Sequence, residues 1–399
     1  MPAPAEIRPK GPSVANDLLA SMVLVIWLYL IAARGGFWRA AERDDDGPSW
    51  NGRWPAVTAV IPARDEAETV AETVASLLRQ DYPGRFDVVV VDDQSRDATA
   101  GVARQAAQAL GASDRLTVLS GRPLPAGWTG KLWAQAQGVQ CAERVAEPPA
   151  YLLLTDADIV YAPQTLTALV KRSAAGGLVL TSLMAKLRCE SFAERAFVPA
   201  FIFFFQMLYP FSFANDPRRA TAAAAGGCML VRRDALNRAG GLDAIRAALI
   251  DDCALAKALK RIGPIRIALT ENVRSVRAYP AVADIRRMVA RTAYAQLRYS
   301  PLILAGTIFA LALTYLAPVY FTIFAAGAAQ FMGLFTWLLM AFAFRPTLRF
   351  YRRSAWWAPA LPAIATAYMA FTLDSAYQHA RGRGGLWKGR AQANISEVR

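Results

Sequence analysis

Long apolar stretches near both ends of the chain enclose a central part with a different pattern. Residues 14–33 are about long enough to cross a bilayer, and residues 301–344 predict two helices joined by a turn near 327–330. Residues 355–373 are also apolar but contain two prolines, so they are expected either to span a membrane or to re-enter it. A signal peptide is the alternative for the first stretch, but its charged start is weak and no cleavage site follows.

In the central part, short apolar runs alternate with runs of helical periodicity. Asp65 and Glu68 have the spacing of a capping box, and Gly111 fits the end of a second helix. Strands are expected at 57–61, 87–91, 116–119, 151–154 and 229–231. Strand–helix alternation of this kind predicts an α/β fold with a doubly wound, mainly parallel sheet.

These patterns divide the chain into expected segments. Residues 197–213 are rich in aromatics and broken by prolines, which indicates a segment at the membrane interface or lining a lipid pocket, with a buried core helix as the alternative. The expected segments are a tail (1–13), an anchor (14–33), a linker (34–55), the sheet domain (56–278), a basic amphipathic interface helix (279–300), a transmembrane hairpin (301–344), a basic cytoplasmic loop (345–354), a further membrane segment (355–373) and a basic tail (374–399).

Composition and charge narrow the possible partners and chemistry. The 399 residues are 55% hydrophobic and carry a net charge of +14, which suits an anionic membrane surface and a phosphorylated substrate better than nucleic acid. His379 is the one histidine and the four cysteines have no CxxC spacing, so a zinc site and histidine catalysis are disfavoured. A metal held by carboxylates would be Mg²⁺ or Mn²⁺.

The basic residues also suggest an orientation in the membrane. By the positive-inside rule, a cytoplasmic sheet domain puts the N-terminus outside and returns the cluster around Arg345 and Arg349 to the inside. A full span over 355–373 would then put Arg381 and Lys388 outside, against the rule.

The sequence TDAD, which follows the apolar run 151–154, carries the strongest chemical signal. Alternate residues of an extended chain point the same way, so Asp156 and Asp158 can reach one divalent ion. Such an ion would neutralise a leaving diphosphate. A solvated turn is the alternative.

Further polar residues follow the other expected strands, at the sheet edge where ligands bind in doubly wound folds. Asp92 and Asp93 suit a nucleotide's base or ribose, or the capping of the next helix. Residues 62–66 (PARDE) form the first strand-to-helix loop, and Lys131, after a glycine-containing loop, could meet a phosphate or be solvated.

A pair of carboxylates, Asp251 and Asp252, opens a helix further along the chain. A helix N-terminus keeps a carboxylate ionised, which suits a general base acting on an acceptor hydroxyl. An ordinary acidic first turn explains the pair equally well.

Together, and in this order, the segments IPARDE, VDDQS, TDAD and the Asp251–Asp252 pair resemble glycosyltransferase family 2, the inverting enzymes of GT-A fold, over about residues 56–300. The resemblance implies that Asp252 is the base with Asp251 beside it, and that Asp156 and Asp158 hold the metal. It assigns to the nucleotide-sugar Pro62, Ala63, Arg64, Glu66, Asp92, Asp93, Lys131 and Asp156. It assigns to the acceptor or a phosphate Gly227, Cys228, Arg298 and Tyr299.

The chain departs from one motif of the processive members of this family. Their QxxRW pattern is matched only loosely by Gln296-Leu297-Arg298-Tyr299, where the glutamine falls one place late. The segment PAGWTGKLWA, followed by TDADI and the C-terminal membrane block, is most similar to the hopene-associated glycosyltransferases of bacterial hopanoid biosynthesis.

This similarity implies a multi-pass enzyme of the bacterial inner (cytoplasmic) membrane with its catalytic domain facing the cytoplasm. It would transfer a sugar, most simply from a UDP-sugar, to a lipid acceptor, with no role for nucleic acid. The alternatives are a processive polysaccharide synthase, a sugar-nucleotide nucleotidylyltransferase, and a non-catalytic scaffold of a lipid pathway.

Overall fold

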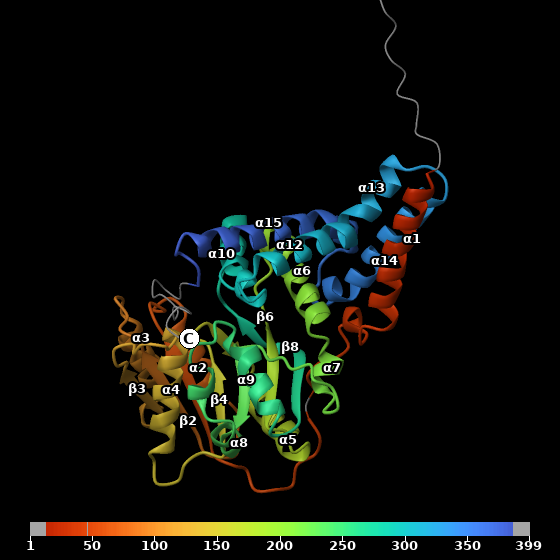
Figure 1. The fold of residues 1–399 in the computed structure, drawn as a ribbon. Coiled ribbons are helices and arrows are strands. Elements are labelled where there is room, and N and C mark those ends of the chain that lie inside the picture. Colours follow the sequence, from red (N-terminus) through yellow and green to blue (C-terminus); the bar gives the residue numbers. More distant parts are fainter. Residues whose placement is uncertain (1–12, 46, 386–399) are drawn as a thin grey trace, which may run out of the picture. The chain divides into compact units, whose positions relative to one another are not determined.

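The computed structural model describes residues 13–45 and 47–385, which fall into two compact units (Figure 1). The sheet unit consists of Ala41–Arg188 and Tyr209–Tyr279. The helical unit contains residues 13–40, Cys189–Leu208 and Pro280–Gly384. Most of the expected N-terminal tail, and the part of the basic tail with Lys388 and Arg390, lie outside the described residues.

The sheet unit is built on an eight-stranded mixed sheet of order β3-β2-β1-β4-β7-β6-β8-β5. The strands are β1 Val57–Ala63, β2 Phe86–Asp92, β3 Leu116–Ser120, β4 Tyr151–Thr155, β5 Ile159–Tyr161, β6 Leu180–Lys186, β7 Cys228–Arg232 and β8 Ile265–Ser275. Strands β3, β2, β1 and β4 are parallel, whereas β7 runs antiparallel to both neighbours and β5 runs antiparallel to β8. The expected doubly wound sheet is therefore present, but its second half is mixed.

Helices cover both faces of this sheet, because alternate strand residues point to opposite sides. The helices are α2 Val70–Leu78, α3 Thr99–Ala109, α4 Gly130–Glu143, α5 Thr165–Ala175, α7 Phe211–Asn215, α8 Arg233–Arg238 and α9 Asp251–Lys260. Ala59 and Ile61 belong to one buried cluster with α2, α3 and α5, and Val60 belongs to another with α4, α8 and α9. The carboxyl ends of the four parallel strands therefore meet at one edge between two helical layers.

The loop after β1 differs from the expected capping box. Asp65 has a left-handed backbone (φ 50°), and α2 begins only at Val70 with Thr69 as its N-cap. The carboxylate of Asp65 accepts a hydrogen bond from the Arg96 backbone N–H (2.7 Å), and its own N–H donates to Ser95 Oγ (3.0 Å). Asp65 thus ties the first loop to the second instead of capping the helix.

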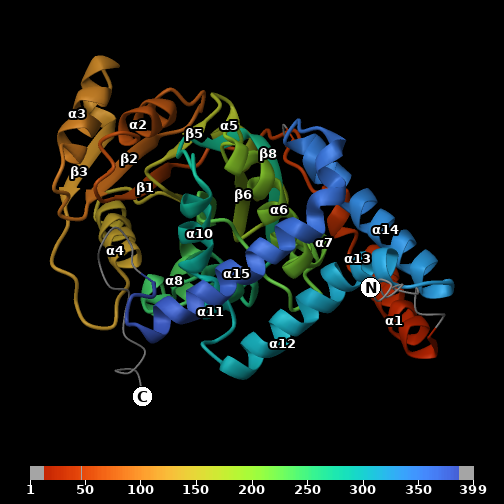
Figure 2. The same ribbon diagram turned by 90° about the horizontal axis from the view of Figure 1, so that it is seen from above.

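The helical unit contains three helices that are long and apolar enough to cross a membrane: Val14–Ala32, Pro301–Phe324 and Ala328–Phe350. Its elements are α1 Val14–Ala32, η1 Phe37–Arg39, α6 Phe192–Leu208, α10 Val282–Ala290, α11 Ala293–Gln296, α12 Pro301–Leu311, a π-helical turn Ala312–Leu316, α13 Ala317–Phe324, α14 Ala328–Phe350, η5 Ala355–Ala360 and α15 Leu361–Ala380. Helix α15 runs beside α10 and α11 (Figure 2), and Ser375 Oγ accepts from the Tyr294 N–H (3.0 Å).

Two features of this unit differ from the expected segments. Helix α14 continues to Phe350, through much of the stretch expected as a basic loop, because buried Phe344 and Leu348 extend its apolar face by one more turn. The aromatic segment 197–213 is split between α6 and α7, and α6 packs one face inside the unit, with Phe203 against Phe37 and Phe344. The buried-helix alternative therefore describes that face of α6.

Candidate active site

The first two strand–helix loops of the sheet unit are joined by an arginine. Arg64, directly after β1, places Nη1 3.7 Å from Asp93 Oδ2 and donates to the backbone carbonyls of Asp93 and Gln94. Asp93 is fully buried, so the guanidinium compensates a charge that burial alone would disfavour. Asp92 Oδ1 accepts from the Ser95 N–H (3.0 Å), which shapes the turn after β2.

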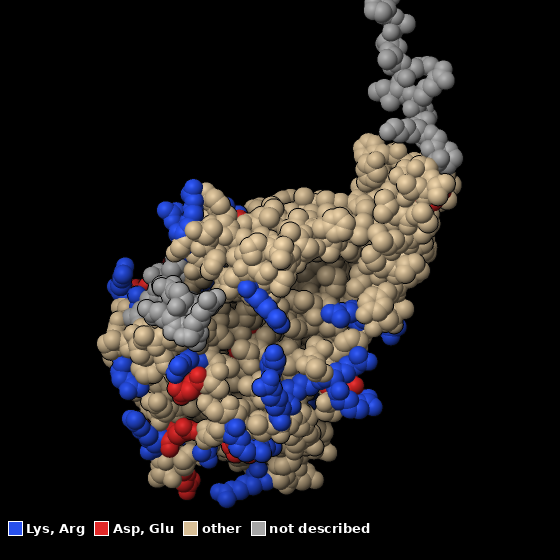
Figure 3. Space-filling view, viewed as in Figure 1, with Lys and Arg blue, Asp and Glu red and all other residues tan. Residues whose placement is uncertain are grey.

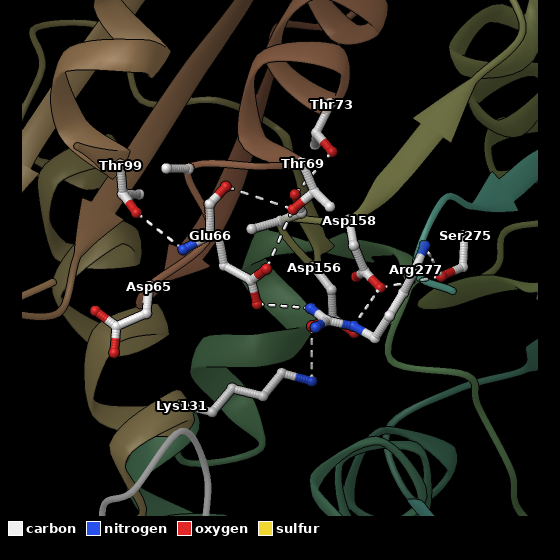
Figure 4. A network of polar contacts seen from close by, with 12 residues as sticks. Asp65, Glu66, Thr69, Thr73, Thr99, Lys131, Asp156, Asp158, Ser275 and Arg277 are labelled. Atoms are coloured by element: carbon white, nitrogen blue, oxygen red, sulfur yellow. Dashed lines mark hydrogen bonds and ion pairs between the residues drawn. The ribbon is translucent and has the colours of Figure 1, made fainter. Parts of the chain in front are cut away.

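Lys131 lies at the centre of the site, near the N-terminus of α4 (Figure 4). Its Nζ is 2.9 Å from Asp156 Oδ1, after β4, and 3.1 Å from Asp251 Oδ2, at the start of α9. Burial opposes the charge of this ammonium, but the two carboxylates outweigh burial and raise its pKa. Lys131 is therefore cationic and connects two acidic motifs that are far apart in the sequence.

Asp252 is held at the first turn of α9 by backbone donors. Its Oδ2 accepts from the Gly226 N–H (3.0 Å) and its Oδ1 from the Cys253 N–H (2.7 Å). Burial, together with the neighbouring charge of Asp251, raises the pKa of Asp252 to about 6, while Lys131 opposes the shift. A carboxylate with this pKa is largely ionised at neutral pH and can accept a proton.

Gly226 is required for close packing at this point. A Cβ there would lie 3.1 Å from Lys131 Nζ and 3.7 Å from Asp252 Oδ2. The carbonyl of the next residue, Gly227, accepts from Thr155 Oγ1 (2.7 Å) and lies 3.0 Å from the Tyr161 hydroxyl. These bonds fix the loop before β7 against the end of β4.

Asp158, the second carboxylate after β4, is nearly buried and faces a different cation. Its Oδ2 accepts from Arg277 Nε (2.9 Å) and from Ser275 Oγ (3.0 Å), and Arg277 Nη2 reaches Glu66 Oε1 at 2.6 Å (Figure 4). Burial raises the pKa of Asp158, and Arg277 opposes this shift.

The carboxylates after β4 have the chemistry of Mg²⁺ or Mn²⁺ ligands, since both ions prefer oxygen donors. Asp156 is the more open of the two, with 34% of its side chain exposed, against 11% for Asp158. Each is paired with a side-chain cation, and within 13–45 and 47–385 no group of three or more His, Cys, Asp or Glu residues is suited to hold a metal. The two carboxylates thus fit part of a metal's coordination sphere, and the remaining ligands would have to come from a bound substrate.

The structure brings most of the predicted site residues together at this edge of the sheet, but not all of them. Pro62 and Ala63 are buried at the end of β1, where they pair with Val91 and Asp92 of β2. They therefore support the site through the backbone of the sheet. The thiol of Cys228 is fully buried in the core cluster of the α2 face, which corrects its assignment to an acceptor or phosphate contact.

Arg298 and Tyr299 belong to the helical unit. Both have a left-handed backbone (φ 54°), and the Tyr299 ring stacks on His379 with centroids 4.4 Å apart. The ring contact gives Tyr299 a local packing role, and the acceptor role of both residues stays a prediction.

Two residues of the site, Ser275 and Arg277, were not predicted from the sequence. Both follow or end β8, a strand whose apolar pattern is interrupted by charges at Glu271 and Arg274. The alternation of Ile265, Ile267 and Leu269 with other residues was the pattern from which strand β8 could have been predicted.

Comparison with known proteins agrees with this architecture. Residues 58–240 match the family model described as Glycosyl transferase family 2. An N-acetylglucosaminyltransferase of Mesorhizobium japonicum is 32% identical over 196 residues, which cover 46% of this chain and 41% of that protein. A 4,4'-diaponeurosporenoate glycosyltransferase of Staphylococcus aureus is 34% identical over 110 residues, 27% of this chain and 24% of that protein. The chain thus spans less than half the length of either relative.

Among solved structures, the mannosyltransferase PcManGT from Pyrobaculum calidifontis, in complex with GDP-Man and Mn²⁺, aligns with 92% of this chain and 99% of its own. Its TM-score is 0.54 at 20% sequence identity, a likeness of fold. The match over residues 58–240 thus makes this part of the sheet unit similar to glycosyltransferase family 2.

Proposed function

We propose that the protein is an inverting glycosyltransferase that moves a sugar from a nucleotide-sugar to a hydroxyl group of a membrane lipid. The observation that carries the proposal is the position of Lys131, within 3.1 Å of both Asp156 and Asp251. It brings a cation suited to a diphosphate next to a helix start that bears the candidate base Asp252.

The residues of this site divide the work of the transfer. The first two loops, with Arg64, Asp92 and Asp93, would bind the nucleoside, and Lys131 would contact the diphosphate. Asp252 would take the proton from the acceptor hydroxyl as its oxygen bonds to the anomeric carbon. The bond from that carbon to the diphosphate breaks on the opposite face, so the configuration inverts and a nucleoside diphosphate leaves.

A divalent ion is expected to take part. Held by Asp156 and Asp158, Mg²⁺ or Mn²⁺ would neutralise charge on the leaving diphosphate when bound. The structural relative PcManGT was solved in complex with GDP-Man and Mn²⁺, which is consistent with this expectation.

The lipid acceptor and the membrane location rest on the helical unit. Large apolar side chains are exposed on its long helices, among them Leu302 (85%), Phe309 (70%) and Phe331 (73%), and broad areas of its surface are free of charged side chains (Figure 3). Because α12–α13 and α14 form a hairpin, Arg345 and Arg349 return to the side of Pro301. By the positive-inside rule we infer a multi-pass protein of the bacterial cytoplasmic membrane with the sheet unit inside.

Within this class, we propose a hydroxylated hopanoid as the acceptor and a UDP-sugar as the donor. The similarity of PAGWTGKLWA and TDADI to the hopene-associated enzymes supports this choice. The displaced glutamine at 296 favours transfer of one sugar over processive synthesis.

Calorimetry on the detergent-purified protein tests the donor site. UDP, UDP-sugars and GDP-mannose are titrated with Mn²⁺ or Mg²⁺ into wild type and Asp158→Ala. Metal-dependent binding of one nucleotide that the substitution weakens supports the proposal, and the absence of binding to every nucleotide contradicts it. Transfer of labelled sugar to hopanoid-containing vesicles, but not to vesicles without hopanoids, then tests the acceptor.

A further inference from the structure

The position of Arg277 is fixed by the strand pairing next to the TDAD motif. Asp158 directly precedes β5, whose first residue, Ile159, pairs with Ser275 at the end of β8. The Val276 N–H donates to the Asp158 carbonyl (2.9 Å). The pairing of β5 with β8 thus fixes the backbone near residue 277 beside Asp158. The Arg277 side chain can therefore reach the Asp158 carboxylate.

The Arg277 side chain forms a fork between two carboxylates from different loops. Its Nε lies 2.9 Å from Asp158 Oδ2, and its Nη2 lies 2.6 Å from Glu66 Oε1. A planar guanidinium can span two acceptors in this way, whereas an ammonium acts as a point charge. Arg277 therefore neutralises one of the two carboxylates that would hold a divalent ion.

The partners of Arg277 are held more firmly than the arginine. Ser275 Oγ donates to Asp158 Oδ2 (3.0 Å), and Thr69 Oγ1 donates to Glu66 Oε2 (3.1 Å). The side chains of Asp158 and Glu66 are 11% and 9% exposed, against 32% for Arg277. Of the three, the arginine has the most open route to solvent.

A divalent ion and the guanidinium compete for the same carboxylate charge on Asp158. With two carboxylates after β4, the protein supplies only part of a coordination sphere, and phosphate oxygens of a substrate commonly complete one for Mg²⁺. The negative charge of a bound nucleoside diphosphate also favours binding of the divalent ion. Its phosphate oxygens can pair with Arg277 once Arg277 has left Asp158.

We propose that Arg277 is a positioning residue that blocks the metal site of the free protein, so that a divalent ion is captured together with the nucleoside diphosphate as Arg277 releases Asp158. This inference rests on the proposed function, since it concerns the same site. It makes metal and nucleotide binding strongly cooperative, and the coupling must be equal in both directions.

The test measures Mn²⁺ binding to the full-length protein in detergent, from the loss of the free-Mn²⁺ electron paramagnetic resonance signal. Wild type without nucleotide should bind Mn²⁺ weakly. Arg277→Gln should bind it at least about tenfold more tightly, because a positive charge next to Asp158 is removed. UDP or GDP should tighten Mn²⁺ binding to wild type by a much larger factor than in the variant.

Two further variants separate this role from a structural one. Arg277→Lys keeps the charge but cannot span both carboxylates, so its Mn²⁺ affinity should lie between those of wild type and Arg277→Gln. If the Gln variant fails to fold, the Lys variant should still bind Mn²⁺ more tightly than wild type. Arg274→Gln removes a charge from an exposed arginine of β8, 3.5 Å from Glu72, and should change Mn²⁺ affinity by no more than about twofold.

Tight Mn²⁺ binding to nucleotide-free wild type overturns the inference, as does an unchanged affinity in folded variants at position 277. These two measurements need no nucleotide, so they decide the role of Arg277 even if neither UDP nor GDP binds. A lack of binding to UDP and GDP would instead count against the proposed donor. A purely structural role predicts looser metal binding in the variants, the opposite direction.

Discussion

Lys131 and Asp251 meet across the candidate site, with Nζ of the lysine 3.1 Å from Oδ2 of the aspartate. The same ammonium is 2.9 Å from Asp156. Because opposite charges inside a protein are poorly screened, a change at Lys131 is expected to alter the ionisation of the whole acidic cluster.

Replacement of Lys131 by methionine should shift the pH dependence of transfer. The pKa of Asp252 is raised to about 6 by burial and Asp251, and Lys131 opposes this shift. A base works only when ionised, so kcat/KM of wild type should fall as the pH drops through about 6. Without the lysine the pKa rises further, and this acid limb should move to higher pH.

A pH profile of nucleoside diphosphate release, measured with a hopanoid-containing lipid extract, checks this shift. Lys257→Met is the matched control, because Lys257 is exposed on the same helix, α9. An acid limb at the same pH in wild type and Lys131→Met would contradict the electrostatic role of the lysine.

Asp252→Asn should lower kcat by roughly 10²–10⁴-fold, the range typical of a lost general base. Donor affinity should remain near that of wild type, because the amide keeps the volume of the side chain at the start of α9. Calorimetry and single-turnover transfer measure the two effects separately. Asp243→Asn, at an exposed aspartate in the preceding short 3-10 helix Leu242–Ile245, should be neutral. Retention of most activity by Asp252→Asn would show that another group is the base.

Gly226→Ala should impair transfer while the protein stays folded. The added methyl would lie 3.1 Å from Lys131 Nζ, so the flexible end of the lysine must move away from Asp156 or Asp251. A displacement of this kind should lower kcat by roughly tenfold, since catalysis is sensitive to misplacement on the ångström scale. Gly101→Ala in α3, where a Cβ meets nothing within 4 Å, is the control and should leave kcat unchanged. Equal activity of the two variants would argue against a tight fit at Gly226.

Tyr161→Phe should reduce stability more than activity. The buried hydroxyl lies 2.7 Å from Thr155 Oγ1 and 3.0 Å from the Gly227 carbonyl, and its loss should cost about 1 kcal/mol. For a unit of this size the midpoint of thermal unfolding should fall by roughly 2–4 °C. Thr155→Val removes the hydroxyl that contacts both Tyr161 and Gly227, and should lower the midpoint further. A larger loss in kcat than in stability would assign Tyr161 a direct part in the reaction.

The first half of the sheet and its polar edge were predictable because each strand there is a mainly apolar run followed by a loop with charged residues. Since parallel strands end at one edge, the places of Arg64, Asp92 and Asp156 directly after or at the ends of their strands are enough to predict that they lie near each other. The family comparison agrees with the class of domain that these motifs indicated.

The second half was less predictable, because the polar Thr181 and Ser182 interrupt the apolar pattern of β6, and charged residues interrupt that of β8. The pairing of β5 with β8 is a long-range contact that no local pattern encodes, and it is this pairing that brings Arg277 to Asp158. Cys228 was assigned to an acceptor or phosphate contact as an implication of the family resemblance. Strand alternation puts its side chain with Leu230 in the core instead.

Neither compact unit is formed by one continuous piece of the chain. The sheet unit is interrupted by Cys189–Leu208, and the helical unit contains segments from before, within and after it. A protease cut or frameshift within Cys189–Leu208 therefore also severs the sheet unit or removes its later strands. The sheet unit cannot be released as a soluble fragment by one truncation, and its transfer onto another anchor would require a designed bridge from Arg188 to Tyr209. We therefore expect the two units to be retained together, both during evolution and in engineered variants.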